Sequence, residues 1–485
     1  MAVGTRRYPV GVIPDRAAAL LDVVAPLAER FDAAGHRLFL VGGVVRDLLV
    51  DRAVGEQAVQ RNDLDLTTDA TPDVIKALVR PVASAVWAQG ERFGTIGCTI
   101  DGETYEITTH RAEAYSPDSR KPEVVFSTDI DADLSRRDFT VNAMALEVTG
   151  SSPQLIDPFG GLDDLNDSVL RTPLAPEISF SDDPLRMMRA ARFIASFGLT
   201  PVPELLAAVH EMAARLDIVS AERIRDELCK LVVVQDPSAG LYFLNDTGLA
   251  DYFLPELPAM RLEQDPIHRH KDVLAHTIAV VAKAPPELLV RLSALFHDIA
   301  KPTTRSIGPS GVSFHHHEVV GARMTRDRMR ALKFSNEMVD QVSQLVYLHL
   351  RFHTYEMGWT DSAVRRFVRD AGPLLAELLA LTRSDCTTRN QRKADALARR
   401  IDGLEERIAE LEAKEELAAI RPDLDGRQIM DHLDLGAGPE IGQALAHLLE
   451  LRLDRGPMDS EQAYRELDLW WAARPAAAAG ADDDR

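Results

Sequence analysis

Residues 38–47 of the chain, Leu38-Phe-Leu-Val-Gly-Gly-Val-Val-Arg-Asp47, carry the clearest fold signal in the sequence. The apolar run predicts a buried strand, and the adjacent glycines Gly42 and Gly43 predict a tight turn into a helix that begins near Val44. Glycines let backbone N–H groups approach a phosphate, and a helix N-terminus favours an anion. A glycine pair alone is equally typical of an ordinary strand-to-helix turn, so its meaning depends on its surroundings.

A carboxylate pair follows sixteen residues after Asp47, in Asn62-Asp-Leu-Asp-Leu66. On a strand, Asp63 and Asp65 would point to one face while the leucines face the core. Such a pair suits Mg²⁺, which prefers a few carboxylate oxygens together with water and substrate phosphates. An Asp-x-Asp by itself is more often a polar strand edge, but beside a glycine turn it indicates a nucleoside triphosphate site.

The composition is that of a packed protein with several domains. The 485 residues suggest about three domains, and 46% apolar with 27% charged residues argues against disorder, collagen or a disulfide scaffold. Short strand signals and one helical stretch alternate up to Asp157, whereas amphipathic helices dominate from about Leu170 onward. We therefore predict an α+β fold, with a small mixed sheet followed by a helical array. Expected helices include Pro184–Ser196, Pro203–Arg215, Ala221–Val233 and Leu288–Ile299, and residues 391–419 suggest a long solvated helix or an antiparallel pair.

Charge and cysteine content limit the partners and the location. The net charge of −21 would repel nucleic acid at long range, so a polyanion must meet a local basic surface. Cys98, Cys229 and Cys386 form no CxxC, which fits a reducing compartment and offers no cysteine zinc site. Without an apolar signal region or a run of 18 apolar residues, we expect a cytoplasmic protein with no membrane partner.

Five patterns, of which the glycine turn with the carboxylate pair is the first, occur in a fixed order within about residues 37–230. They are Gly42-Gly43-Val-Val-Arg46-Asp47 with Asp63-Leu-Asp65; Arg136-Arg137-Asp138-Phe-Thr-Val-Asn142-Ala143; Asp157-Pro-Phe-Gly160-Gly161; Asp182-Asp183-Pro-Leu-Arg186-Met-Met-Arg189-Ala-Ala-Arg192; and Glu222-Arg223-Ile-Arg-Asp-Glu227-Leu228. This ordered set resembles the class II tRNA nucleotidyltransferases (CCA-adding enzymes) and the related bacterial poly(A) polymerases. The resemblance implies an N-terminal nucleotidyltransferase domain of the polymerase-β type.

The resemblance also implies a two-metal transfer of a nucleotide to an RNA 3′-hydroxyl. Asp63 and Asp65 would be the catalytic residues and hold two Mg²⁺ ions, and Glu106 is a candidate third carboxylate whose facing the periodicity leaves undecided. Backbone amides and guanidinium groups suit the oxygens of a triphosphate or a sugar. The residues expected to make those contacts are Gly43, Arg46 and Arg137.

The fourth pattern carries a charged stripe. Asp183, Arg186 and Arg189 are three residues apart and lie roughly on one helix face, with Arg192 one step further round. Periodicity alone indicates only a solvated face. The resemblance implies that these four residues bind the incoming nucleotide in place of a nucleic-acid template. Asp183 would accept from the amino group of C or A while Arg186 donates to the ring nitrogen, and U or G would cost about 1–3 kcal/mol.

Two segments bear on which member of the family the chain resembles. Gly90-Glu-Arg-Phe-Gly-Thr95 lacks the paired basic residues of poly(A) polymerases, which favours the tRNA enzyme. Residues 113–122 resemble the flexible loop that full CCA-adding enzymes use when they switch from C to A. An ordinary surface loop is the alternative for that segment.

Residues 267–385 resemble an HD domain, a helical metal-dependent phosphohydrolase fold. The resemblance gives His276, His297, Asp298 and Asp385 as ligands of a further divalent metal, and Mn, Fe, Ni, Zn or Mg would suit them. Phosphatase or 2′,3′-cyclic phosphodiesterase activity toward RNA ends is the implied chemistry, and a retained tRNA scaffold is the alternative. Candidates for a second ion or a phosphate are His317 and His349.

The function predicted from the sequence is template-independent addition or repair of the 3′-terminal CCA of tRNA from CTP and ATP. Alternatives are a poly(A) or A-only polymerase, an HD phosphohydrolase as the main activity, or an RNA-binding module; the oligomeric state stays open. The expected divisions are a head at 1–165, a nucleotide-selecting neck with RNA-binding helices at 166–265, the HD domain at 266–390, a C-terminal helical region at 391–475 and a disordered tail at 476–485. Candidate RNA contacts, equally typical of solvated faces, are Arg365, Arg366, Arg369, Arg389, Arg392 and Lys393.

Overall fold

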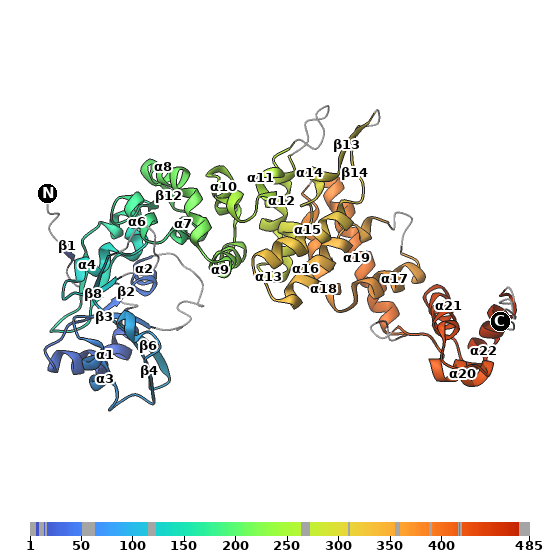
Figure 1. Cartoon of the computed structure of the whole chain (residues 1–485), viewed down its shortest axis with the longest axis horizontal. Coiled ribbons are helices and arrows are strands. Elements are labelled where there is room, and N and C mark those ends of the chain that lie inside the picture. Colours follow the sequence, from blue (N-terminus) through green and yellow to red (C-terminus); the bar gives the residue numbers. More distant parts are fainter. Residues whose placement is uncertain are drawn as a thin grey trace, which may run out of the picture. The chain divides into compact units, whose positions relative to one another are not determined.

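The chain forms two compact units, Met1–Pro258 and Ala259–Arg485 (Figure 1). The finer domain boundaries expected from the sequence stay predictions, and the tail at 476–485 lies outside the described residues. The computed structural model describes residues 6–8, 14, 17–50, 64–114, 123–262, 272–308, 311–354, 359–387, 390–415, 417 and 420–474.

The first unit is built on an eight-stranded sheet with the order β1-β10-β9-β2-β3-β6-β5-β4. Its strands are β1 (Arg6–Tyr8), β2 (Leu38–Val41), β3 (Leu64–Thr68), β4 (Ala85–Trp87), β5 (Thr95–Ile100), β6 (Glu103–Thr109), β9 (Ala145–Glu147) and β10 (Gln154–Asp157). Strands β3 and β6 run parallel, whereas the other paired neighbours run antiparallel. The mixed sheet and the α+β class predicted from the sequence are confirmed.

The two faces of this sheet have different partners because side chains alternate along each strand. Helices α1 (Ala18–Ala33) and α3 (Pro72–Val79) contribute to the apolar core on one face, where Leu66 and Ile107 are buried. The opposite face packs Phe39 and Val41 against the short helix α4 (Ile130–Ser135). Next to that smaller apolar patch the same face carries the carboxylates of β3 and β6.

Helices complete the first unit after the sheet. The predicted helix Pro184–Ser196 is α7 (Leu185–Phe197), which packs against α9 (Ala221–Val232) and α10 (Ser238–Asp246). The remaining helices of this region are α6 (Pro176–Asp182), α8 (Pro203–Met212) and α11 (Glu256–Ala259). The predicted span Pro203–Arg215 is divided, because α8 ends at Met212 and a 3-10 helix follows over Ala213–Ile218.

The second unit is almost entirely helical. Its first helices are α12 (Val273–Lys283), α13 (Leu288–Phe296), α14 (Lys301–Thr304), α15 (His317–Ala331), α16 (Asn336–Leu348), α17 (Asp361–Ala371) and α18 (Leu375–Asp385). One hairpin, β13 (Arg305–Gly308) with β14 (Gly311–Phe314), interrupts them although the sequence shows little strand signal there. Residues 391–412 form one continuous helix, α19 (Gln391–Glu412), rather than an antiparallel pair, and it buries Ile401, Leu404 and Ile408.

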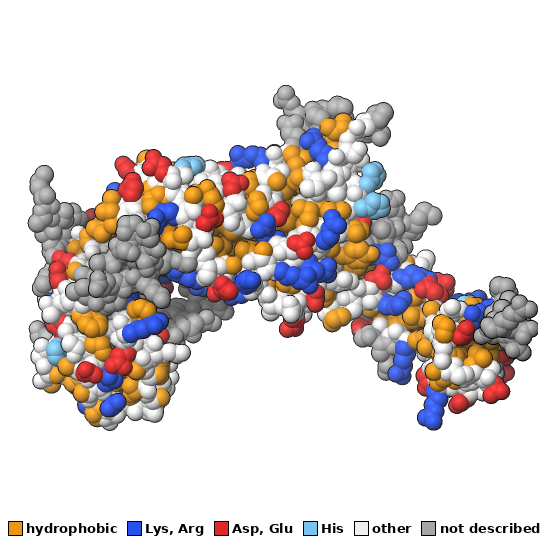
Figure 2. All heavy atoms as spheres, viewed as in Figure 1, with side chains coloured by type: hydrophobic (Ala, Val, Ile, Leu, Met, Phe, Trp, Pro, Cys, Tyr) orange, Lys and Arg blue, Asp and Glu red, His pale blue; other side chains and the backbone are white. Residues whose placement is uncertain are grey.

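A last group of three helices has its own apolar cluster, in which Ile429, Leu448 and Leu467 are buried. They are α20 (Gly426–Leu433), α21 (Pro439–Arg455) and α22 (Ser460–Ala472). No helix among the described residues is long and apolar enough to cross a membrane. Figure 2 shows basic and acidic side chains interspersed over the visible face of the helices, without a broad basic surface there.

Candidate active site and metal centre

The glycine turn, one carboxylate and one arginine meet at the end of β2, as the sequence led us to expect. Gly42 has a φ of 75°, and a Cβ at this position would lie 3.3 Å from Nη1 of Arg137 and 3.9 Å from Oδ2 of Asp65. Only glycine adopts this backbone readily and leaves this space open. Helix α2 (Gly43–Leu49) then begins at Gly43, one residue before the expected start.

The carboxylate Asp65 lies exposed on β3, directly opposite Glu106 on the parallel strand β6. Register pairs on neighbouring strands point to the same face, so the structure decides the facing of Glu106 that periodicity left open. Asp65 lines a cavity of about 480 Å³, and Glu106 lines an adjoining cavity of about 600 Å³. Asp63 lies outside the described residues.

Arginines give these cavities the local basic surface that an acidic protein needs for a polyanion. Arg136 and Arg137 are both held from behind by the buried Asp133, at 2.8 Å and 3.3 Å. Burial alone would raise the pKa of Asp133, but the two guanidinium groups hold it below its usual value. Sequence reasoning missed Asp133, although its (i, i+3) and (i, i+4) spacing to the two arginines was a usable signal.

The start of α7 presents Asp183 and Arg186 to both cavities. Oδ1 of Asp183 accepts from the backbone N–H of Leu185 at 3.1 Å, which anchors the carboxylate at the helix start. Arg186 is buried and donates to Oγ of Ser179 at 2.9 Å and to the backbone carbonyl of Arg136. The pair predicted to read the incoming base therefore lies together and is held from several sides.

The next residues of the stripe differ in position. Arg189 lines the smaller cavity and donates to Oδ2 of the buried Asp138 at 2.5 Å. Burial alone would raise the pKa of Asp138, but Arg189 and a hydrogen bond from Asn142 hold it below its usual value. Arg192 is not among the residues that line either cavity and instead pairs with Glu227 of α9 at 2.9 Å.

Arg46, expected at the triphosphate or sugar, is only 8% exposed. It donates to Oδ1 of Asn142 at 2.8 Å and stacks 4.1 Å from the ring centroid of Phe197. Neither Arg46 nor Gly43 is among the residues that line the two cavities. In the structure Arg46 joins α2 to the second motif and to α7.

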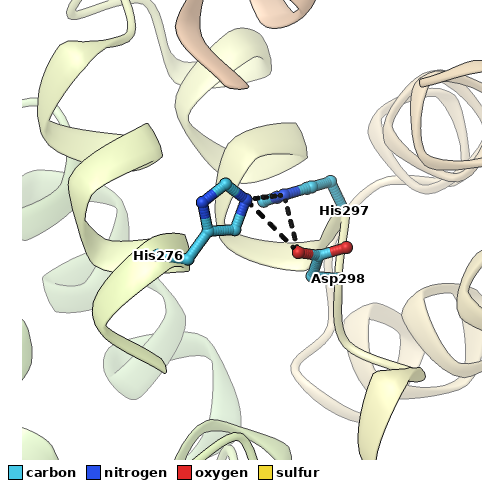
Figure 3. A group of neighbouring side chains, drawn as sticks. All are labelled: His276, His297 and Asp298. Atoms are coloured by element: carbon cyan, nitrogen blue, oxygen red, sulfur yellow. Dashed lines mark hydrogen bonds and ion pairs between the residues drawn. The ribbon is translucent and has the colours of Figure 1, made fainter. Parts of the chain in front are cut away.

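A second constellation lies in the helical unit. The side chains of His276 on α12 and of His297 and Asp298 after α13 point toward one another (Figure 3). Nε2 of His276 and Nε2 of His297 are 3.3 Å apart, and each lies within 3.4 Å of Oδ2 of Asp298. Asp385, at the end of α18, brings Oδ1 to 3.0 Å from Nε2 of His276. The four residues predicted from the sequence are brought together.

The same Asp298 faces a second pair of histidines with its other oxygen. Oδ1 of Asp298 lies 3.5 Å from Nε2 of His317 and 4.0 Å from Nε2 of His349, and the two ring nitrogens are 3.2 Å apart. Two groups of potential ligands therefore share one carboxylate. Imidazole nitrogens with carboxylate oxygens suit transition metals, so this donor set fits a pair of divalent ions.

The far side of each ring fixes which nitrogen faces the centre. Nδ1 of His297, His317 and His349 each lies within 2.8 Å of a backbone carbonyl oxygen, and Nδ1 of His276 lies 2.8 Å from Oγ1 of Thr387. Such outer hydrogen bonds orient metal-binding histidines. Burial lowers the pKa of His349 to about 4, so its ring is neutral at pH 7, as a metal ligand must be.

The side chain of Lys301, which sequence reasoning missed, also lies in this centre. Nζ of Lys301 lies 2.7 Å from Oδ2 of Asp298, one turn along the chain. Burial alone would raise the pKa of Asp298, but His297 and Lys301 hold it well below its usual value. The carboxylate is therefore charged and available to a cation at neutral pH.

The candidate RNA contacts differ in how exposed they are. Arg365 is buried and pairs at 2.9 Å with Glu415, whose side chain is only 4% exposed, and Arg366 pairs with Asp454 at 2.8 Å. Arg366 therefore joins α17 to α21, and Arg365 joins α17 to the turn that follows α19. Arg389 lies outside the described residues, as do residues 115–122 of the loop expected to act in the C-to-A switch. The remaining candidates, Arg369, Arg392 and Lys393, are exposed.

Comparison with known protein families matches three consecutive parts of the chain. Residues 38–171 match the family described as "Poly A polymerase head domain". Residues 198–260 match "Probable RNA and SrmB- binding site of polymerase A", and residues 273–401 match "HD domain". The head match contains every strand of the eight-stranded sheet except β1, together with its carboxylates, and the HD match contains all six residues of the histidine and aspartate centre.

Curated relatives extend the similarity over most of the chain. An A-adding tRNA nucleotidyltransferase of Deinococcus radiodurans is 32% identical over 448 residues, which cover 89% of this chain and 95% of that enzyme. A CCA-adding enzyme of Enterococcus faecalis is 31% identical over 70% of this chain and 75% of its own length. A CCA-adding enzyme of Lactobacillus gasseri is 36% identical, over 50% of this chain and 56% of its own length.

Solved structures show the same fold. The CCA-adding enzyme of Bacillus stearothermophilus in complex with CTP superposes with a TM-score of 0.64 at 22% identity, covering 95% of this chain and 98% of that one. The Thermotoga maritima CCA-adding enzyme complexed with tRNA gives a TM-score of 0.60 at 18% identity, covering 96% and 99%.

Proposed function

This chain belongs to the tRNA nucleotidyltransferase family, and we propose that it adds or repairs the 3′-terminal CCA of tRNA from CTP and ATP. One observation carries the proposal: Asp183, an acceptor, and Arg186, a donor, are suited to a base edge and border the same cavity as the carboxylate of Asp65. A base-reading pair and a phosphoryl-transfer carboxylate in one cavity suit a polymerase that selects nucleotides without a template. The named functions of the relatives support the same activity.

The reaction joins the RNA 3′-oxygen to the α-phosphorus of a nucleoside triphosphate, and pyrophosphate leaves. The carboxylate oxygens of Asp65 and Glu106 fit hard divalent cations, and with Asp63 they would hold magnesium. Magnesium bound there would neutralise triphosphate charge and favour ionisation of the attacking hydroxyl. Arg137, held by Asp133 beside the glycine turn, is placed to bind triphosphate oxygens, because a guanidinium donates to two oxygens at once.

Base selection follows from the hydrogen-bonding edge. C and A both present an amino donor beside a ring-nitrogen acceptor, which matches the carboxylate of Asp183 and the guanidinium of Arg186. U and G present a carbonyl oxygen in place of the amino group, so an acceptor would face an acceptor at a cost of about 1–3 kcal/mol. One pocket would thus admit both nucleotides that CCA synthesis needs.

The decisive experiment incubates the purified chain and Mg²⁺ with tRNA transcripts ending before CCA, after C and after CC. CTP and ATP are supplied singly and together, and UTP and GTP serve as controls. Products that stop at CCA support the proposal. Addition of A only to CC ends would match the name of the Deinococcus relative, and A addition would then replace CCA addition as the activity of this chain. Long A tails on unrelated RNA would contradict the proposal.

We also propose a second, hydrolytic activity for the HD domain, directed at phosphate on RNA ends. Two groups of potential ligands that share Asp298, with Asp385 beside one of them and each histidine oriented by a hydrogen bond at Nδ1, favour a working metal centre over a retained scaffold. The test measures release of phosphate from RNA 3′-phosphates and opening of 2′,3′-cyclic phosphates with each candidate metal. If the chain binds none of these metals when they are supplied and hydrolyses neither substrate, the HD domain is a retained tRNA scaffold.

The cytoplasm is the proposed location. The three cysteines are free, which suits a reducing compartment, and tRNA maturation takes place where tRNA, CTP and ATP are present. Fractionation of cells that express the tagged chain, with a cytoplasmic enzyme as marker, would test this location.

A further inference from the structure

Four residues form a straight row across the sheet. Trp87 on β4 pairs with Gly97 on β5, Gly97 pairs with Glu106 on β6, and Glu106 pairs with Asp65 on β3. Register partners on neighbouring strands project to the same face. An aromatic ring, an empty position and two carboxylates therefore follow one another on the face opposite to the α1 and α3 core.

Gly97 has no side chain, and the indole of Trp87 fills the space that a side chain there would take. A Cβ built on Gly97 would lie 2.0 Å from Nε1 and 2.1 Å from Cε2 of Trp87, so the ring lies directly against the backbone of β5. Neighbouring strands are about 4.8 Å apart. The ring is therefore brought one strand closer to Glu106 than its own strand would place it, and it lies within about two strand spacings of Asp65.

The indole forms part of the wall of the larger cavity, of about 600 Å³. Trp87, Phe93, Gly97 and Glu106 line this cavity. Asp183 and Arg186 line both this cavity and the smaller one. Trp87 is only half buried, so part of the ring stays available to a ligand. A planar apolar surface beside a carboxylate suits a nucleobase whose ribose reaches that carboxylate.

We propose that Trp87 is the stacking platform for the last base of the acceptor RNA, and that the larger cavity is the subsite for that terminal nucleotide. The inference rests on the proposed nucleotidyl transfer and adds the position of its second substrate. When the base of the terminal nucleotide stacks on Trp87, the 3′-hydroxyl of its ribose faces Glu106 and Asp65. The α-phosphate must approach the same carboxylates from the other side.

The charge distribution places the incoming nucleotide on that other side. The smaller cavity, which contains Asp65, is also bordered by Arg137 and Arg189. Both cavities are lined by Arg111, Arg136, Arg186 and Arg223, and the larger one has Trp87 and Phe93 where the smaller one has Arg137 and Arg189. A triphosphate gains most from the two additional arginines, whereas the end of an RNA strand gains most from an aromatic surface.

The first test compares Trp87→Ala with Trp87→Phe in steady-state addition of A to a minihelix RNA that ends in CC. Loss of one stacked base is expected to raise the KM for the RNA about 5- to 150-fold. The KM for ATP is expected to change less than twofold, and Phe should restore most of the RNA affinity. A rise in the KM for ATP with an unchanged KM for RNA would overturn the inference and give the platform to the incoming base.

A binding measurement separates stacking from strand damage. A minihelix with 2-aminopurine as its last base is titrated with the full chain without divalent metal, so that no addition occurs. Quenching of 2-aminopurine by the wild-type chain and by Trp87→Phe, but not by Trp87→Ala, supports the platform. The matched control is Val86→Ala, which removes an apolar side chain from the opposite face of the same strand and should leave quenching intact.

Gly97→Ala gives an independent route to the same result. The added Cβ would displace the indole, so this variant should reproduce the RNA defect of Trp87→Ala, and the double variant should be no worse than either single one. Full additivity of the two defects would contradict the inference. If the wild-type chain adds nucleotides while all these variants keep a normal KM for RNA, the inference fails and the proposed function stands.

Discussion

Nη2 of Arg223, on α9, donates a hydrogen bond of 2.7 Å to Oδ2 of Asp183, the carboxylate that precedes α7. The other oxygen of Asp183 accepts from the backbone of Leu185, so both oxygens are held in place. Arg223 also borders both cavities. An arginine from the fifth sequence motif thereby fixes the orientation of the acceptor that is proposed to read the incoming base.

Replacement of Arg223 by alanine should lower nucleotide selectivity. A freed carboxylate can rotate away from the amino group of C or A, and a charge-assisted hydrogen bond is lost, worth about 1.5–3 kcal/mol. Because Arg223 is partly exposed, we expect the low end, about a tenfold fall in kcat/KM for CTP and ATP, with a smaller effect on UTP. Arg225→Ala, on the same helix but paired with Asp226 and away from the cavities, is the control. Equal kinetics for the two variants would refute the orienting role.

The buried pair of Asp138 and Arg189 should make stability depend on acid pH. The folded-state pKa of Asp138 lies below that of the unfolded chain, near 3.9, so the unfolded chain takes up the proton first as the pH falls. The contribution of the pair is full above the unfolded pKa and is lost as the pH falls through the folded-state pKa. Urea unfolding of the wild-type chain between pH 3 and 7 should show this loss.

Asp138→Asn should flatten that pH dependence and destabilise the first unit at neutral pH. Removal of one partner of a buried pair costs roughly 3–5 kcal/mol, and the low end is expected because Glu227 remains 3.6 Å from Arg189. The exposed Asp22→Asn on α1 is the control and should match the wild-type chain. An unchanged unfolding curve for Asp138→Asn would show that the pair contributes nothing.

The glycine turn can be tested by alanine substitutions at two glycines with a positive φ. Gly35 and Gly42 have φ angles of 76° and 75°, but a Cβ at Gly35 would meet nothing within 4 Å. Gly35→Ala should lose about 1–2 kcal/mol of stability from the positive φ, and Gly42→Ala should lose more, because its ψ of −137° lies outside the left-handed helical region. Only Gly42→Ala should also lose nucleotide addition, because its Cβ crowds Arg137. Comparable activity in both variants, measured at a temperature where both are folded, would argue against the close approach.

The two proposed activities should separate by mutation. Asp65→Asn is expected to reduce nucleotide addition by at least a hundredfold and to leave hydrolysis of RNA-end phosphates unchanged, and His276→Ala should do the reverse. Metal analysis adds a second readout that does not depend on activity: His317→Ala should hold about one divalent ion fewer than the wild-type chain. Loss of both activities in His276→Ala, with a normal melting temperature, would contradict independent sites.

The sequence alone yielded the local elements and most members of both sites. The strand, glycine turn and helix over residues 38–49 follow from short-range patterns, as does the near-exact extent of α7. The ligands His276, His297 and Asp298 came from a family resemblance, and the structure brings them together with Asp385. The strand, the turn and α7 depend on spacing within single elements, which a sequence displays directly, whereas the ligands were found by matching residues to a family pattern.

Contacts between distant elements were decided only by the tertiary structure. The family resemblance gave Arg192 as a nucleotide-binding residue, but Arg192 pairs with Glu227 of α9 and does not itself line either cavity, and Arg365, a candidate RNA contact, pairs with Glu415 instead. A charged side chain goes to the partner that lowers its desolvation cost, and that partner lies far along the chain. The row from Trp87 to Asp65 has the same origin, since strand register depends on how the whole sheet pairs and not on any one strand.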